Sequence, residues 1–548
     1  MSLIRGNGIN PEQAFALFPM METGMVAASE LPININATAL QMANEIFGNG
    51  VTVVSASYTG DNRSSGIYSD GDSVSPNATP GDTGVILSTG RARDFTNSNG
   101  QSNQNAGTST NTSGVNNDAG FNAIAGGSTY DASIMDIDFI PTGDTLTMQF
   151  TLSSEEYPEY WASYSDIIGV WINGSYVEMS VGNGDADVQN INSGSNENQY
   201  LDNTSDAFNT EMDGLTITLT LTIPVNPGVV NSIRIGVADQ GDSAYDTNLL
   251  IAGDSLQTTL VAIDDSSTMY ANGTRIIDVL GNDINSTSGT LTITHLNGIA
   301  VTIGTTITLP SGETVTLNAD GTLNVVGDAD VDEISFTYGI QSSTGDTDVG
   351  FVTIDKIPCF VSGTMILTPD GEVAVETLQP GDLVMTHDEG PQPLRWIGQR
   401  TVPAKASFAP VRIAAGTFGD HRTLLVSPQH RVLIRDSLAE LLFGEAEVLV
   451  AAKDLVNDKS VRIQEGGDVT YVHLLFDRHQ VIFSEGLTTE SFLPGPQTSH
   501  AFEQDIVDEI CALFPEIDPD TGLGYSPSAR RTLRRYEAQI LVSNSMAA

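Results

Sequence analysis

Short runs of alternating apolar and polar residues occupy most of the chain between residues 51 and 254, and Gly, Asn and Asp separate them. Side chains that alternate with a period of two lie on opposite faces of a β-strand, so one face of each run can be buried. Strands repeated in this way predict an antiparallel β-sandwich. The runs are 51–54, 84–87, 146–150, 167–172, 215–223 and 233–237.

Apolar residues at helical spacing occur near both ends of the chain. Residues 37–47 have this spacing and stop at Gly48, which predicts a short helix. The same spacing recurs in 501–514 and in a segment opened by Ser526 and Pro527, whose apolar residues lie opposite several arginines. We therefore expect a mainly β protein with a short helical C-terminal tail.

The chain is too long for a single hydrophobic core, because its 548 residues exceed the size at which single cores stop growing. The pattern divides it into an irregular N-terminal segment, a β-sandwich, a second β-sandwich, a third all-β domain and the tail. The predicted boundaries are 1–34, 35–255, 257–357, 358–495 and 496–548. Six of the seven histidines lie after residue 357, so we expect chemistry in the third domain.

The chain is strongly acidic, with a formal net charge of -47 from 22 Lys and Arg against 69 Asp and Glu. A protein that binds the phosphates of nucleic acids needs the opposite sign, which argues against such a partner. The sequence has no uninterrupted apolar run long enough to span a membrane. We expect neither nucleic acid nor a membrane span.

The first two thirds of the chain are rich in Asn, Asp, Gly, Ser and Thr and poor in Lys, as in exported bacterial proteins. The first thirty residues lack the apolar core and small-residue cleavage site of a signal peptide. We expect a secreted or cell-surface protein, exported without an N-terminal signal peptide, with a cell-surface or extracellular ligand.

Cys359 is one of two cysteines and lies in the run Pro358-Cys359-Phe360-Val361-Ser362-Gly363-Thr364. The string Ser427-Pro428-Gln429-His430 follows, and His479 comes later. A thiol can attack the carbonyl carbon of the preceding residue, a hydroxyl can orient the reacting groups, and a histidine can protonate the departing nitrogen. These residues therefore predict self-cleavage at the bond between Pro358 and Cys359.

Simpler interpretations stay open. A lone cysteine is ordinarily a small buried apolar residue, and His430 and His479 can be ordinary core histidines. A disulfide between Cys359 and Cys511 is disfavoured, because the two lie in different domains. The remaining histidines of the third domain are interpreted as structural or exposed; they are His387, His421 and His473.

Acidic residues in the first sandwich could form a Ca²⁺ site, since Ca²⁺ prefers carboxylate oxygens. Solvated acidic loops explain the same pattern equally well. The sequence shows no CxxC or paired histidines for zinc and no nucleotide-binding loop, so no cofactor is required. The candidate ligands are Glu155, Glu156, Asp166, Asp239, Asp242 and Asp246.

The first sandwich resembles the choice-of-anchor L domain of bacterial surface and secreted proteins. The resemblance rests on the strings Ile86-Leu87-Ser88-Thr89-Gly90, Ser153-Ser154-Glu155-Glu156-Tyr157-Pro158 and Val237-Ala238-Asp239. Residues 257–357 resemble the cadherin-like (Ig-type) repeats of bacterial adhesins through Val279-Leu280-Gly281-Asn282-Asp283. These resemblances imply a surface location and a spacer, and neither implies a reaction.

The third domain resembles the Hint fold, the Hedgehog/intein module, in its bacterial intein-like subgroup. Besides the Cys359 string, Leu378-Gln379-Pro380-Gly381-Asp382-Leu383-Val384 and Glu490-Ser491-Phe492-Leu493-Pro494-Gly495 match the family. The resemblance implies Cys359 as nucleophile, Ser427 as orienting residue and His430 as proton donor. It assigns His479 an auxiliary role.

The sequence departs from splicing inteins in ways that limit the reaction. Splicing needs a final His-Asn pair, and this chain has Thr488-Thr489-Glu490-Ser491 instead, so we expect cleavage without two-ended splicing. Pro358 places a rigid residue before the scissile bond. The leading hypothesis is a single-turnover acyl shift on the protein's own backbone, and the alternative is a non-enzymatic adhesin with a silent Hint domain.

Overall fold

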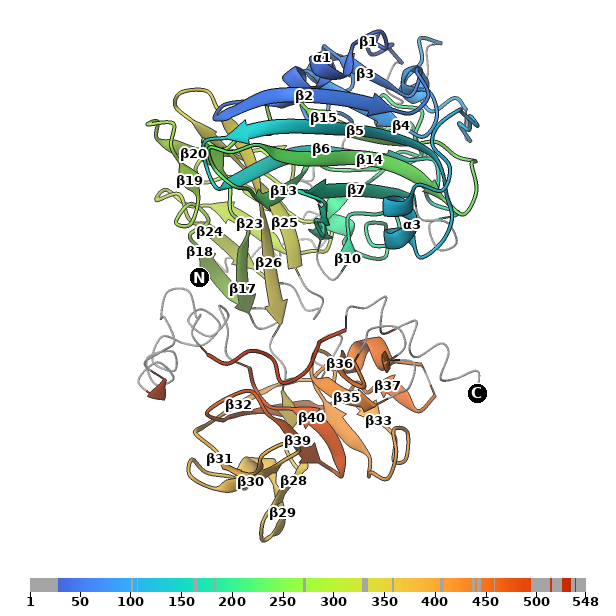
Figure 1. The fold of residues 1–548 in the computed structure, drawn as a ribbon. Helices are drawn as coiled ribbons and strands as arrows, with labels where there is room; N and C mark the ends of the chain where they lie inside the picture. The colour runs from blue at the N-terminus through green and yellow to red at the C-terminus, as the bar shows by residue number, and fades with distance from the viewer. Residues whose placement is uncertain are drawn as a thin grey trace, which may run out of the picture.

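The computed structural model describes most of the chain in two lobes, one of strands β1 to β26 and one of strands β27 to β40 (Figure 1). The described residues are 28–99, 102–105, 107–160, 166–181, 184–269, 273–327, 334–356, 359–404, 409–435, 439–440, 445–457, 459–493, 513–514, 525–533 and 538. The predicted irregular segment therefore lies almost wholly outside the described residues.

The first domain consists of two main sheets that enclose one core, as the alternating pattern predicts. The larger sheet contains β1 (Ile33–Asn34), β3 (Ser65–Tyr68), β4 (Gly84–Ser88), β15 (Thr247–Ala252), β6 (Thr145–Ser154), β12 (Gly214–Thr216) and β11 (Tyr200–Asp202), with β13 (Leu219–Pro224) also on β6. The second contains β2 (Val51–Thr59), β5 (Thr129–Pro141), β14 (Asn231–Gln240), β7 (Ile167–Ile172) and β8 (Ser175–Tyr176). A small pair is formed by β9 (Ser180–Val181) and β10 (Gly184–Asp185).

The predicted N-terminal helix is present as α1 (Ala39–Ile46). Thr38 and Gln41 form a capping box at its start, which satisfies backbone N–H groups that have no partner within the helix. The buried face carries Met42, Ala43 and Ile46 and joins the core of the first domain. The other short helices of the described residues are α2 (Gly71–Val74) and α3 (Ala119–Ala125).

Two expectations for the first domain need correction. The run 215–223 is not one strand but divides between β12 and β13, because the side chain of Thr216 accepts the backbone N–H of Leu152 where a ladder bond would lie. The stretch 97–119, whose many Asn, Ser, Gly and Thr residues predict a long surface loop, is not wholly exposed, and Thr108 is buried. Its backbone N–H groups are needed inside, where they bind buried carboxylates, including that of Glu155.

The second domain has two facing sheets and a small pair. One sheet contains β17 (Asp265–Met269), β26 (Thr347–Lys356), β25 (Ile334–Ser342), β20 (Leu291–Leu296) and β21 (Ile299–Ala300). The other contains β18 (Thr274–Ile277), β24 (Leu323–Val326), β23 (Thr314–Leu317) and β22 (Thr306–Thr308). The pair is β16 (Leu260–Val261) with β19 (Ile284–Asn285).

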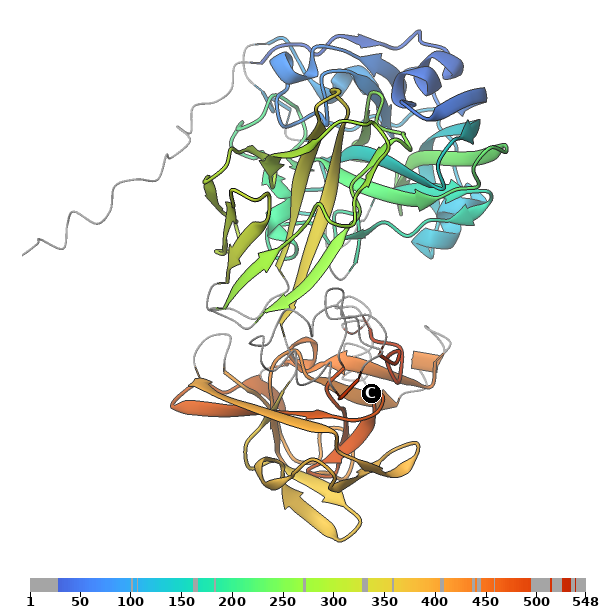
Figure 2. The same cartoon turned by 90° about the vertical axis from the view of Figure 1, so that its left-hand side faces the viewer.

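This second domain is joined to the first by buried contacts. The carboxylate of Asp348, which is buried, accepts hydrogen bonds from Thr147 and Gln149 of the first domain at 3.1 and 3.2 Å. Phe351 belongs to the core of the first domain although it lies on β26. The two domains therefore share an interior, and Figure 2 shows them in one lobe.

The third domain is built from two sheets around its own core. One contains β32 (Trp396–Pro403), β38 (Asp468–Leu475), β27 (Phe360–Val361), β34 (Leu424–Val426), β33 (Val411–Ile413) and β37 (Val461–Ile463). The other contains β29 (Gly371–Ala374), β28 (Met365–Thr368), β39 (Val481–Ser484), β40 (Leu487–Glu490), β35 (Arg431–Arg435) and β36 (Glu447–Ala451), with β30 (Leu383–Thr386) and β31 (Gly390–Pro393) beside them. The mainly β fold class is confirmed.

The predicted tail helices are only partly seen. The segment 501–512 lies outside the described residues, and Leu513 and Ala538 are helical. Residues 525–533 are not helical, contrary to the expectation of a helix opened by Ser526 and Pro527. Main-chain hydrogen bonds to Leu449 of β36 replace the bonds that a helix would make within this segment.

Candidate active site around Cys359

Cys359 lies at the start of β27, where the chain pairs with two strands of the third domain. Phe360 pairs with Val426 of β34 on one side and with Val472 of β38 on the other. Cys359 is 5% exposed and packs with Tyr471, Val469 and Ala404. Burial of the sulfur raises the pKa of the thiol well above its usual range, although contact with Ser427 and the charge of Arg400 act in the opposite direction.

Ser427 binds both polar groups of the Cys359 backbone. The N–H of Cys359 donates to Oγ of Ser427 at 2.7 Å, and the N–H of Ser427 donates to the carbonyl oxygen of Cys359 at 2.9 Å. The amide nitrogen of Cys359 is the atom that must depart if the preceding bond breaks. The hydroxyl of Ser427 therefore contacts the nitrogen of the predicted scissile bond, while Pro358 itself lies outside the described residues.

His430 lies next to this segment at the turn between β34 and β35. Its ring centroid is 4.3 Å from that of Phe360, and its backbone N–H donates to the carbonyl oxygen of Ser427 at 3.0 Å. The side chain is buried, and neither ring nitrogen has a hydrogen-bond partner. Burial lowers the pKa of His430 to about 4, against the opposing effect of Glu490.

His473 also contacts the sulfur, and the sequence interpretation missed it. Its Nε2 lies 3.4 Å from Sγ of Cys359, and the side chain is 2% exposed. The register that pairs Phe360 with Val472 brings Cys359 opposite His473. The available signal was alternation, because 469, 471 and 473 share one face of a strand and the first two pack against Cys359.

His479 is buried but lies among other partners. Its Nε2 is 3.4 Å from Oε2 of Glu490 and 3.1 Å from the carbonyl oxygen of Ser491, and its Nδ1 accepts the N–H of Ala529 at 3.0 Å. These contacts are to Glu490, Ser491 and the C-terminal segment, and none of them reaches Cys359. Its electrostatic effect does reach His430.

Glu490 is a second residue that the sequence interpretation passed over. Its side chain is fully buried and accepts the N–H of Arg431 at 2.8 Å and its guanidinium at 3.2 Å. Burial raises the pKa of this carboxyl, but Arg431, His479 and His430 outweigh that effect and hold the pKa at about 2. Glu490 is therefore a fixed negative charge near His430.

The candidate calcium ligands of the first domain lie at one edge of its sandwich. Glu155 and Glu156 follow β6, Asp166 precedes β7, and Asp239 and Asp246 flank the loop between β14 and β15. These five are buried and so are not solvated surface acids, whereas the sixth candidate, Asp242, is half-buried. Four of the five have one carboxylate oxygen without a hydrogen-bond partner: Glu155, Glu156, Asp239 and Asp246.

Burial sets the protonation of these acids. It raises the pKa of Glu155 and of Glu156 to about 8 and that of Asp166 and of Asp246 to about 7. In the described part of the chain, no three His, Cys, Asp or Glu side chains are gathered so that they could hold a metal ion. Calcium binding by these residues stays a prediction.

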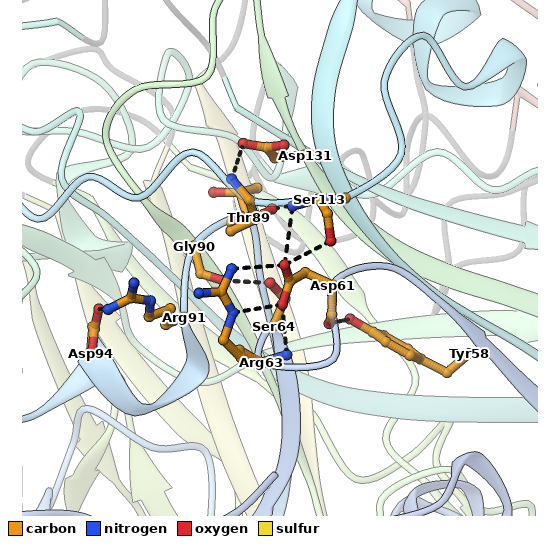
Figure 3. Close-up of polar contacts among 12 residues, drawn as sticks. Tyr58, Asp61, Arg63, Ser64, Thr89, Gly90, Arg91, Asp94, Ser113 and Asp131 are labelled. Carbon is orange, nitrogen blue, oxygen red and sulfur yellow. Dashed lines mark hydrogen bonds and ion pairs between the residues drawn. The ribbon is translucent and has the colours of Figure 1, made fainter. Parts of the chain in front are cut away.

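A neighbouring carboxylate, Asp61, shows how a fully partnered acid of the same domain differs (Figure 3). Arg63 binds both of its oxygens at 2.8 Å, and Ser113 donates two further hydrogen bonds. These bonds hold the pKa of Asp61 far below its usual range, and the bond to Arg63 has the largest effect. Asp61 is therefore a structural ion pair, unlike the acids near the β14–β15 loop.

Two protein-family models match the sequence. Residues 32–257 match the choice-of-anchor L domain, and residues 358–496 match the Hint domain. No curated protein matches the chain. Within the described residues, no helix has the length and apolar character needed to cross a membrane.

Solved inteins are among the similar structures. The MchDnaB-1 intein is 12% identical, with 24% of this chain and 98% of that chain covered and a TM-score of 0.17. The gp41-1 intein is 11% identical, with 24% and 97% covered and a TM-score of 0.16. The zinc-bound splicing domain of the Msm DnaB1 intein is 13% identical, with 24% and 98% covered and a TM-score of 0.16.

Proposed function

Because the chain carries a choice-of-anchor L domain followed by a Hint domain, we propose that it cleaves its own backbone between Pro358 and Cys359. The observation that carries this proposal is the double contact of Ser427 with Cys359, together with His473 at 3.4 Å from the sulfur. One reacting segment thus has a nucleophile, a base beside it and a hydroxyl on its leaving nitrogen.

The proposed reaction is an N–S acyl shift. Sγ of Cys359 bonds to the carbonyl carbon of Pro358, and the bond from that carbon to the nitrogen of Cys359 breaks. The thiol proton passes to His473 and reaches the departing nitrogen by way of His430. The products are a thioester and a free α-amine, so the step needs no oxidant, reductant or cofactor.

The low pKa of His430 keeps its ring neutral near pH 7, so in the proposed reaction it must first receive the proton from His473. An imidazolium with a pKa of about 4 is a stronger acid than an ordinary histidine, and an amide nitrogen is a poor leaving group. His473 lies close enough to influence the charge of His430. Tethering the sulfur next to its target supplies much of the remaining rate enhancement.

The thioester would then be resolved by water or another nucleophile. Hydrolysis would release a fragment that ends at Pro358, which holds both domains of the first lobe, and would regenerate the thiol. The choice-of-anchor L domain and the acidic, Lys-poor composition of this portion support a place for it at the cell surface or outside the cell.

A silent Hint domain in an adhesive surface protein is the second candidate. It is favoured by the burial of Cys359, which holds the thiol in its protonated form. In this candidate the β domains alone would act, and the bond before Cys359 would stay intact.

Intact-mass measurement of the purified full chain with excess hydroxylamine separates the two candidates. We expect two fragments, divided between Pro358 and Cys359, that accumulate with time in the parent protein and are absent from the Cys359→Ala variant. The same fragment in Cys359→Ala would refute the nucleophile. An intact parent chain after days would support the silent domain.

A further inference from the structure

The C-terminal segment 525–533 lies against the Hint domain beside His479. Oη of Tyr525 donates to the carbonyl oxygen of Phe476 at 2.6 Å. The backbone N–H of His479 donates to Oγ of Ser526 at 2.7 Å, and the N–H of Ala529 donates to Nδ1 of His479 at 3.0 Å. The segment therefore holds both the backbone and the ring of this histidine.

The same segment is anchored further along β36. The N–H of Leu449 donates to the carbonyl oxygen of Arg531 and the N–H of Leu533 to that of Leu449, both at 2.8 Å. Arg530 pairs with Glu447 and Asp388, and Leu533 is buried in the core of the domain. These contacts make the segment an integral part of the Hint fold although it lies beyond residues 358–496.

The contact with Ala529 determines the tautomer of His479. A ring nitrogen that accepts a hydrogen bond carries no proton, so the single proton of the neutral ring is on Nε2. That atom faces the carbonyl oxygen of Ser491 and the carboxylate of Glu490. The docked segment therefore fixes which ring nitrogen of the neutral His479 carries the proton.

Glu490 connects this arrangement to the reacting groups. Its carboxylate contacts His479 and Arg431. Its negative charge raises the pKa of His430, whereas burial and the positive charges nearby lower it. Because all of these side chains are buried or partly buried, a change in the position of Glu490 is felt strongly at His430.

We propose that segment 525–533 is a positioning element for self-cleavage: through the Ala529 N–H it fixes His479, which in turn contacts Glu490, the buried carboxylate whose charge acts on His430. This inference rests on the proposed function. It makes His479 and Glu490 positioning residues rather than proton donors. It also predicts that the Hint domain needs a part of the chain outside residues 358–496, which the family model matches.

The test uses the full chain with Ala529→Pro, which removes the N–H, and Ala529→Gly, which keeps it. Cleavage by hydroxylamine is followed by mass across pH, and ¹⁵N shifts of labelled histidines report the tautomers. We expect cleavage in Ala529→Pro to slow about tenfold, as for one lost hydrogen bond, with a shifted pH profile. His479 should also lose its Nε2–H tautomer in this variant, and Ala529→Gly should behave as the parent.

A parent spectrum with the proton of His479 on Nδ1 would overturn the proposal. The proposal would also fail if Ala529→Pro kept the parent cleavage rate and pH profile although the His479 ring had changed tautomer. Thermal unfolding checks that Ala529→Pro folds. If it does not, Ser526→Ala takes its place, because it removes the oxygen to which the His479 N–H donates. We expect Ser526→Ala to cleave more slowly with a shifted pH profile, and an unchanged cleavage rate would count against the proposal. If no protein cleaves, the proposed function fails, while the tautomer still tests the positioning.

Discussion

Cys359 and His473 face each other across the antiparallel pair β27–β38, with Sγ 3.4 Å from Nε2. Both side chains are buried, and burial raises the pKa of the thiol, so the sulfur keeps its proton until a base removes it. His473 is the base in contact with that sulfur. In the proposed self-cleavage, the base would therefore be a histidine that does not belong to the Ser427–His430 pair.

Replacing His473 with Gln should slow hydroxylamine-dependent cleavage about a hundredfold, because general base catalysis of this kind contributes about that much. Glutamine keeps a polar side chain of similar length but accepts no proton. His387→Gln is the matched control, since His387 pairs with Glu447 away from Cys359 and should cleave as the parent. Cleavage of His473→Gln at the parent rate would remove His473 from the mechanism.

Ser427→Ala should reduce the cleavage rate about tenfold to a hundredfold, because the N–H of Cys359 loses the oxygen to which it donates. Ser427→Thr keeps the hydroxyl and should retain most of the rate. Intact mass against time measures both variants. Equal rates in the alanine and threonine variants would show that the hydroxyl only supports the local backbone.

Glu490→Gln should destabilise the Hint domain by about 3 kcal/mol, because it leaves the Arg431 and His479 side chains without a buried negative partner. Urea unfolding of the full chain, followed on the transition of this domain, measures the loss. Glu372→Gln is the control, since its pair with Arg422 is partly exposed and should cost less than about 1 kcal/mol. Equal losses in the two variants would contradict the assigned role of Glu490.

The same carboxyl should limit stability in acid. The pKa of Glu490 lies at about 2 in the folded chain, below its ordinary value of 4.5, so the folded state binds the proton of this carboxyl less tightly than the unfolded state does. The resulting stability is present above the unfolded pKa and is lost as pH falls from 4.5 toward about 2. Acid titration should show this loss in the parent and a smaller one in Glu490→Gln.

The first domain should respond to pH in the opposite direction. The pKa values of Glu155 and Glu156 are raised to about 8, so their protonated forms favour the folded state. Stability from this source is complete below the unfolded pKa and is lost as pH rises through about 8. Calorimetry should show a lower transition temperature at about pH 9 than at about pH 6.

Glu156→Gln provides the matched variant for this prediction, because the amide copies the neutral acid. We expect it to raise the transition temperature at high pH and to leave it nearly unchanged at low pH. Added calcium provides a further test. If calcium restores the transition temperature of the parent at high pH, a cation can replace these protons. No pH dependence in the parent would contradict the protonated state of the buried acids.

The amino-acid sequence determined the features that depend on neighbours along the chain. Alternation predicted strands such as β4 and β7, and the spacing from residue 37 to Gly48 predicted α1. The strings around Cys359 and Ser427 indicated the kind of chemistry, because a thiol and a hydroxyl–histidine pair are rare in so Cys-poor a chain.

Tertiary structure alone decided which groups meet. Cys359 and His473 are 114 positions apart, and only the register of β27 on β38 brings them together. The register also leaves Glu490 buried with its partners, whereas its sequence context indicated only the absence of a splicing pair. At the tail, main-chain bonds to Leu449 outweighed the local preference for a helix, because the free energy of long-range pairing is not encoded in the spacing of nearby residues.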